Sequence, residues 1–160
     1  MDKLFWVIPG KLAGRPGPDQ EPWNLAALRA GGIGAILSVN DGLLCQPQDF
    51  AVAGITYACM PLSSNAPPQP GDEHICLRVL PLAYAFVQAQ MEQGHGVVVH
   101  CSGGKDRTGL FLGYFFMQHM GLSPQEAIQA VRHVRPIALS APGWEEFAQQ
   151  VLRCGWGGTP

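Results

Sequence analysis

The chain has 160 residues, of which 47% are hydrophobic and 14% are charged, and its formal net charge is −2. This composition excludes a disordered, strongly charged chain, and the length suggests one domain over residues 1–160. A nucleic-acid-binding protein would normally be basic, so we expect no nucleic-acid partner. We expect no membrane span, because the longest apolar run, residues 109–117, is far shorter than the roughly 20 residues that cross a bilayer. Nothing in the sequence indicates more than a monomer.

Short apolar runs alternate with segments of helical periodicity along the chain. Gly31 and Gly32 end the first helix, and Ser123 begins a later one with a capping box closed by Glu126. Pro81 is expected to kink the longest helix. The expected elements, in chain order, are a strand at 4–8, a helix at 23–30, a strand at 35–39, a helical turn at 49–53, a strand at 56–61, a helix at 72–93, a strand at 97–100 and helices at 108–120, 123–133 and 142–154.

This alternation predicts an α/β fold in which a central, mostly parallel β-sheet is flanked by helices. Residues 56–61 and 97–100 are mostly apolar without clean alternation, which is typical of strands buried on both faces. The helix at 108–120 is almost wholly apolar, so we expect it to be buried too.

The cysteines and histidines give no pattern of a metal site or a disulfide framework. The cysteine count is odd, no Cys-x-x-Cys pair occurs and the five histidines lack zinc spacing, so we expect no metal and no other cofactor. The first residues lack the long apolar region of a secretory signal, and we therefore expect a cytoplasmic protein. The cysteines are Cys45, Cys59, Cys76, Cys101 and Cys154.

One segment, residues 97–109, carries most of the chemistry: Val-Val-Val-His-Cys-Ser-Gly-Gly-Lys-Asp-Arg-Thr-Gly. A buried strand enters a glycine-rich loop, which enters an apolar helix. Such a turn aims backbone N–H groups inward, and the helix N-terminus adds further unpaired N–H groups and a positive dipole end. Gly103 and Gly104 allow positive φ and close approach of an oxyanion such as phosphate. The predicted phosphate-binding residues are Ser102, Gly103, Gly104, Lys105, Asp106 and Arg107.

Cys101 lies at the bottom of this electropositive loop. A helix N-terminus and nearby cations lower a thiol pKa from near 8.5 into the range of about 3.5–7.5. The thiolate can then attack phosphorus and form a phosphocysteine, which water hydrolyses. Arg107 can bind two equatorial oxygens through its planar fork, and the hydroxyl of Thr108 can donate to the sulfur and help it leave. His100 is expected to support the loop from behind by hydrogen bonds to its backbone.

The pattern His-Cys-x-x-Gly-x-x-Arg-Thr-Gly at residues 100–109 resembles the signature of the cysteine-based protein tyrosine phosphatases. The small size and the preceding segments resemble the dual-specificity subgroup, and residues 55–62 and 123–136 fit that family's order of elements. The resemblance implies a protein tyrosine phosphatase-like fold and metal-free chemistry. It also implies a phosphorylated protein, phosphotyrosine first, or a small phosphomonoester as substrate.

The family also needs a general acid, usually an Asp on a mobile loop that precedes the cysteine. Here that loop is 61–73, and alignment of its Pro-Pro pair puts Ser64 where the Asp would stand. Asp72 lies at about the family's spacing, although it also suits a helix cap, and Glu73 is a weaker candidate. Asp106 is favoured, because it is fixed near the scissile bond and some bacterial relatives with a Gly-Lys-Asp-Arg loop use that Asp. Without an acid, only substrates with good leaving groups would react.

The leading prediction is a phosphatase, and other functions stay open. Lys105 suits a highly phosphorylated substrate, which makes a phosphoinositide or inositol phosphate the alternative. The loss of the expected Asp at Ser64 would suit a phosphate-binding module without turnover. A reductase or sulfurtransferase often needs a second reactive thiol, and Cys59 is the candidate for it. Arg15 and Arg135 are expected to form surface ion pairs rather than to reach the site.

Overall fold

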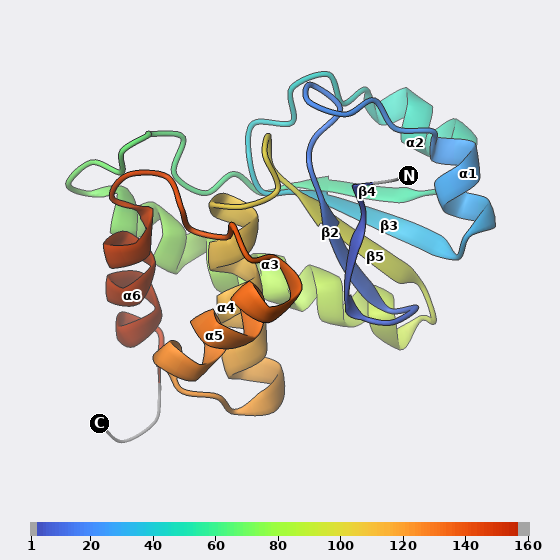
Figure 1. Ribbon diagram of the computed structural model, residues 1–160. Helices are drawn as coiled ribbons and strands as arrows, with labels where there is room; N and C mark the ends of the chain where they lie inside the picture. Colours follow the sequence, from blue (N-terminus) through green and yellow to red (C-terminus); the bar gives the residue numbers. More distant parts are fainter. Residues whose placement is uncertain (1–2, 157–160) are drawn as a thin grey trace.

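The computed structural model describes residues 3–156. Across that range the chain forms one five-stranded sheet of order β1-β2-β5-β3-β4 (Figure 1). The strands β2, β5, β3 and β4 are parallel, and β1 pairs antiparallel with β2. The mostly parallel α/β sheet is thus confirmed. The strands are β1 (Phe5–Ile8), β2 (Leu12–Arg15), β3 (Ile33–Ser38), β4 (Thr56–Cys59) and β5 (Gly96–His100).

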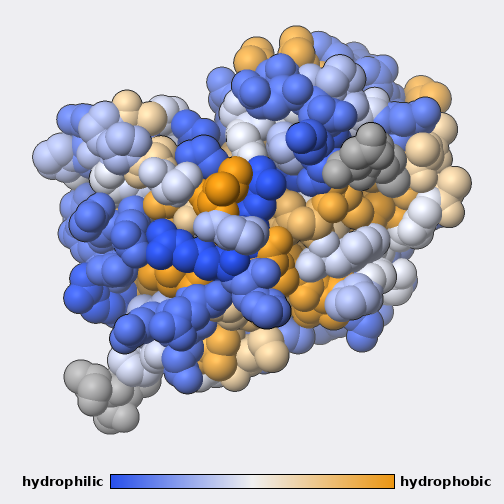
Figure 2. All heavy atoms as spheres, in the orientation of Figure 1, coloured by the Kyte–Doolittle hydropathy of each residue, from blue (hydrophilic) through white to orange (hydrophobic). Residues whose placement is uncertain are grey.

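Helices cover both faces of the sheet, two on one side and four on the other (Figure 1). The described residues include no helix long and apolar enough to cross a membrane. Figure 2 shows mostly hydrophilic residues over α5 and α6, because these helices are amphipathic and turn their apolar sides inward. The first face carries α1 (Leu25–Ala30) and α2 (Pro47–Ala53), and the second carries α3 (Asp72–Glu92), α4 (Arg107–Met120), α5 (Pro124–Val134) and α6 (Trp144–Cys154).

The two faces of the sheet are buried in separate hydrophobic clusters. Leu37 and Val99 pack with the side chains of α3, α4, α5 and α6. Their chain neighbours Ile36 and Val98 pack on the other side with Leu28 of α1. Because successive residues of a strand face opposite sides, a strand covered on both faces carries apolar residues at consecutive positions. This explains the run of valines in β5, which fixes that strand in the middle of the molecule.

The observed elements follow the predicted order, with one strand missed. β2 reads Leu-Ala-Gly-Arg, which is short and contains a glycine and a charged residue, so nothing in its composition indicates a strand. The segment forms a strand because β1 and β5 pair with it on either side. Pro81 lies within α3, which continues as one helix. The capping box of Ser123 and Glu126 is present at the start of α5, as predicted.

Candidate active site

The carboxyl ends of the parallel strands bring four loops together. In the register of the sheet, His100 of β5 lies level with Arg15 of β2 and Ser38 of β3. The loops that leave these strands therefore flank the loop that follows β5, which we call the signature loop (residues 101–107). This edge of a parallel sheet is where α/β proteins usually bind ligands.

The two ends of the signature loop are tied to neighbouring segments by backbone hydrogen bonds. Gly17 N, beyond β2, donates to Ser102 O at 2.8 Å, and Leu139 N, beyond α5, donates to Lys105 O at 3.1 Å. Both bonds draw carbonyl groups to the outside of the loop. Because the C=O and N–H of one peptide point in opposite directions, the N–H groups of the same peptides are turned toward the inside.

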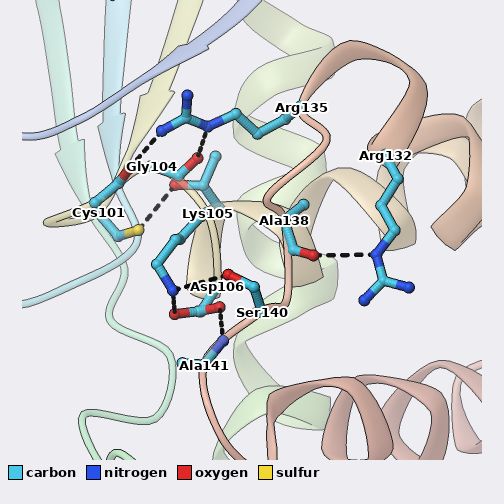
Figure 3. Close-up of polar contacts among 11 residues, drawn as sticks. Cys101, Gly104, Lys105, Asp106, Arg132, Arg135, Ala138, Ser140 and Ala141 are labelled. Atoms are coloured by element: carbon cyan, nitrogen blue, oxygen red, sulfur yellow. Dashed lines mark hydrogen bonds and ion pairs between the residues drawn. The ribbon is translucent and has the colours of Figure 1, made fainter.

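Arg135 holds the two carbonyl groups in the middle of the signature loop (Figure 3). Its Nη2 donates to Gly103 O at 2.8 Å and its Nε donates to Gly104 O at 3.2 Å. Its guanidinium also lies over the ring of Phe5, 5.2 Å from the centroid. Among the described residues, no N–H group of 102–107 donates to a protein acceptor. These N–H groups form an open nest for an oxyanion.

Gly104 is the position in the loop that requires glycine. Its φ is +66°, and a Cβ there would lie 2.7 Å from the backbone carbonyl of Arg15. Gly103 has no positive φ, and a Cβ there would meet only the flexible side chain of Lys105. Close packing of β2 against the loop, as well as positive φ, therefore explains the glycine at Gly104.

Cys101 begins the loop and is almost completely buried, with 2% of its surface exposed. The hydroxyl of Thr108, also buried, donates to Cys101 Sγ at 3.1 Å. Arg107 is the first residue of α4, so the sulfur lies near the N-terminus of a 14-residue helix. The sulfur thus lies against a hydrogen-bond donor and close to the positive end of a helix dipole.

Arg107 joins the signature loop to the loop that follows β4. Its Nε donates to Ser63 O, and its Nη2 donates to Ser64 O at 3.1 Å. The guanidinium lines a cavity of about 210 Å³ at the carboxyl edge of the sheet. The residues lining this cavity are Asp19, Asn40, Asp41, Leu43, Pro61, Leu62, Ser64, Ser102 and Arg107.

His100 lies behind the loop, fully buried. Its Nδ1 donates to Cys101 O at 2.9 Å, because a carbonyl oxygen can only accept. Burial lowers the pKa of His100 to about 4, so the ring is neutral and Nε2 accepts from Ser38 Oγ at 2.6 Å. Ser38 in turn accepts from Tyr57 Oη at 2.7 Å. The chain of bonds fixes one tautomer and orients the carbonyl of Cys101.

Lys105 and Asp106 pair with each other (Figure 3), and neither lines the cavity. Lys105 Nζ lies 2.9 Å from Asp106 Oδ2 and donates to Ser140 Oγ at 3.2 Å. Asp106 Oδ1 accepts from Ala141 N at 3.3 Å. Both side chains thus hold the segment that follows α5 against the signature loop.

Asp72 begins α3 and has 6% of its surface exposed. Its carboxylate accepts from Gln69 N at 2.7 Å, from Asn65 Nδ2 at 2.9 Å and from Ser63 Oγ at 2.7 Å. These donors, the Gln69 N–H first, hold the pKa of Asp72 below its usual value. The carboxylate organises the loop that Arg107 contacts, and it does not line the cavity. Glu73 likewise accepts from a backbone N–H, that of Gly71.

Several residues of the site are ones that sequence reasoning missed or placed elsewhere. Asp19 and Asp41 line the cavity, and Asp19 Oδ2 accepts from Ser102 Oγ. The expectation of surface ion pairs is wrong for Arg15, which is 2% exposed beneath the loop, and for Arg135. Only the folded structure shows these positions: the strand register brings Arg15 level with His100, and the C-terminal end of α5 brings Arg135 to the signature loop. Cys59 contacts Asn40 O rather than the signature loop.

Comparison with known proteins agrees with this geometry. The family model described as "Dual specificity phosphatase, catalytic domain" matches residues 24–152. Dual specificity phosphatase 28 of Homo sapiens is 32% identical over 82 residues, which are 48% of this chain and 47% of that protein. Dual specificity protein phosphatase 15 of Mus musculus is 28% identical over 152 residues, 94% of this chain and 57% of that protein. The chain thus spans about half the length of these relatives.

The fold has close counterparts among solved structures. The structure titled Tk-PTP in the active form superposes with a TM-score of 0.74 at 19% identity, covering 94% of this chain and 97% of that one. At that identity the similarity shows the fold alone, while the family match covers β3, β4, β5 and the signature loop. The chain belongs to the family of dual specificity phosphatase catalytic domains.

Proposed function

We propose that the protein is a cysteine-dependent phosphatase that hydrolyses phosphate monoesters through a phosphocysteine intermediate. The observation that carries this proposal is the signature loop, in which open N–H groups surround a buried sulfur that Thr108 contacts. A cradle of this kind binds a tetrahedral oxyanion, and the nucleophile lies at its base. Family membership supports the same chemistry.

In this mechanism Cys101 Sγ attacks phosphorus in line with the leaving oxygen. The N–H groups of residues 102–107 and the guanidinium of Arg107 hold the equatorial oxygens, whose charge they stabilise in the transition state. Water then attacks the phosphocysteine, the P–S bond breaks, and Thr108 stabilises the departing thiolate through its 3.1 Å hydrogen bond. His100 supports the loop without exchanging protons.

We infer that the substrate is a phosphorylated protein, with phosphotyrosine first and phosphoserine or phosphothreonine second. Leu43, Pro61 and Leu62 give the cavity an apolar wall that suits an aryl ring. The alternative of an inositol phosphate depended on Lys105 as an extra cation for the substrate. Because that ammonium pairs with Asp106, the geometry favours the protein substrate.

The test is phosphate release from 4-nitrophenyl phosphate, a phosphotyrosine peptide and a phosphoserine peptide. We expect the wild type to turn over and Cys101→Ser to show no turnover. Cys154→Ser is the matched control, because that thiol is exposed at the end of α6, and it should keep full activity. Phosphate binding without release by the wild type would contradict the proposal and favour a non-catalytic binding module.

We further infer a monomeric protein of the cytoplasm that works without a cofactor. Its cysteines are all free thiols, which supports a reducing compartment. Light scattering at micromolar concentration tests the monomer, and any stable dimer would contradict it.

A further inference from the structure

The proposed phosphatase reaction leaves one task unassigned, the protonation of the leaving oxygen. The expected position holds Ser64, whose hydroxyl is too weak an acid for the task near neutral pH. The carboxyl groups of Asp72 and Asp106 do not line the cavity above Arg107. Asp72 is held ionised by its donors, and Asp106 is paired with Lys105 and accepts from Ala141 N.

Two other carboxyl groups line that cavity, those of Asp19 and Asp41. Asp19 is engaged with the loop itself, since its Oδ2 accepts from Ser102 Oγ and its Oδ1 is buried. Asp41 is exposed, and within the described part of the chain its side chain makes no hydrogen bond or ion pair. Of the two, Asp41 is the one whose carboxyl group can face a bound substrate.

The position of Asp41 follows from the order of the sheet. β3 is a direct neighbour of β5, and Val39 N donates to His100 O at 2.9 Å, so the loop after β3 leaves the sheet beside Cys101. Asn40 then makes a tight turn, because its Oδ1 accepts from Gly42 N at 3.0 Å. Asp41 lies at the centre of that turn.

The backbone around Asp41 is held on both sides. Cys59 of β4 donates from its Sγ to Asn40 O at 3.4 Å, and Cys45 N donates to Gly42 O at 2.9 Å. An acid must stay within reach of the oxygen that it protonates. The hydrogen bonds of the turn hold the backbone of Asp41 in place and leave its carboxyl group free of polar contacts with the described residues.

We propose that Asp41 is the general acid of this phosphatase, an inference that rests on the function proposed above. As Cys101 Sγ bonds to phosphorus and the P–O bond breaks, the carboxyl group of Asp41 gives its proton to the leaving oxygen. In the second step, water attacks phosphorus and transfers a proton to the Asp41 carboxylate while the P–S bond breaks. The cycle returns Asp41 to its protonated form and Cys101 to the thiolate.

The experiment compares 4-nitrophenyl phosphate with phenyl phosphate, which have similar shape but good and poor leaving groups. Asp41→Asn should lower kcat/KM for phenyl phosphate, which covers the steps up to cleavage of the P–O bond, by about 10²-fold or more, the usual contribution of a general acid. For 4-nitrophenyl phosphate the loss of kcat/KM should stay below about tenfold, since that leaving group needs little protonation. Asp41→Glu, which keeps a carboxyl group at this position, should restore part of the rate.

Asp49→Asn is the matched control, because Asp49 is an exposed carboxyl in the first turn of α2 that does not line the cavity. Asp106→Asn, Asp72→Asn and Asp19→Asn complete the set. Equal losses on both substrates in Asp41→Asn, or a loss that depends on the leaving group in one of the other variants instead, would overturn the assignment. The proposed function has its own test, since Cys101→Ser must abolish turnover of 4-nitrophenyl phosphate whichever acid is used.

Discussion

Two buried titratable residues show how the surroundings of a side chain decide its role. Asp72 has the identity and spacing of a family acid, yet its backbone and side-chain donors hold it as an anion. His100 is uncharged because it is buried and its Nδ1 proton is used by a carbonyl oxygen. Neither property can be inferred from the residue types, because both depend on partners that folding brings together.

His100 gives a prediction about stability and pH. Its folded pKa of about 4 lies below the ordinary value of 6.5, so the unfolded chain binds more protons between these values. The free energy of unfolding should therefore fall as the pH drops from about 6.5 to about 4, by on the order of 3 kcal/mol from this residue. Asp72 acts in the same direction at lower pH, because its folded pKa lies below 3.8.

Urea denaturation at several pH values between 4 and 7.5 measures the effect. In His100→Gln this part of the pH dependence should be lost, whatever the variant's stability at neutral pH. The same slope in wild type and variant would contradict the assignment.

Among the elements, those with local signals were predictable from the sequence and those that depend on partners were not. The capping box of α5 and the valines of β5 each indicate the secondary structure within a few consecutive residues. β2 is a strand only because β1 and β5 flank it. For the site, the sequence predicted the loop that carries Cys101 and Arg107 together. It could not place Asp41 or Arg135, since these reach the cavity or the loop from distant segments.

Two arginines at the C-terminal end of α5, Arg132 and Arg135, give a prediction for the signature loop. Arg135→Lys removes the fork that binds Gly103 O and Gly104 O, so the nest of N–H groups should lose its shape. We expect inorganic phosphate to inhibit this variant about tenfold more weakly, the effect of roughly one charged hydrogen bond.

Arg132→Lys is the control for this substitution. Arg132 binds Ala138 O and Glu145 and does not touch the signature loop (Figure 3). Its phosphate inhibition constant should stay within about twofold of the wild type, since partly exposed ion pairs contribute little. Equal weakening in the two variants would show that Arg135 acts only through general stability.

At the scale of the whole molecule, the smaller cluster beneath α1 and α2 supports the site from behind. Phe50 stacks on Tyr57 at 4.1 Å between ring centroids, and Tyr57 Oη continues to Ser38 and His100. Packing on the face opposite α3–α6 thus reaches the backbone of Cys101 through a row of hydrogen bonds.

Phe50→Ala tests this arrangement. Phe50 is 1% exposed, so the variant should lose about 3–5 kcal/mol of unfolding free energy in urea denaturation. Val52 on the same helix is 89% exposed, and Val52→Ala should change stability by less than about 0.5 kcal/mol. A loss below about 1 kcal/mol in Phe50→Ala would contradict a supporting role for this cluster.

Arg107 has a consequence for the entropy of ligand binding. A guanidinium carries five N–H hydrogens, and one from Nε and one from Nη2 are directed to Ser63 O and Ser64 O. The remaining three lie on Nη1 and Nη2, which together can hold two oxygens of a phosphate. The loop after β4 and the phosphate can therefore be bound by the same side chain at once. The loop after β4 is therefore ordered before the oxyanion binds. Calorimetric titration with an oxyanion should then show only a small entropy loss from ordering of this loop.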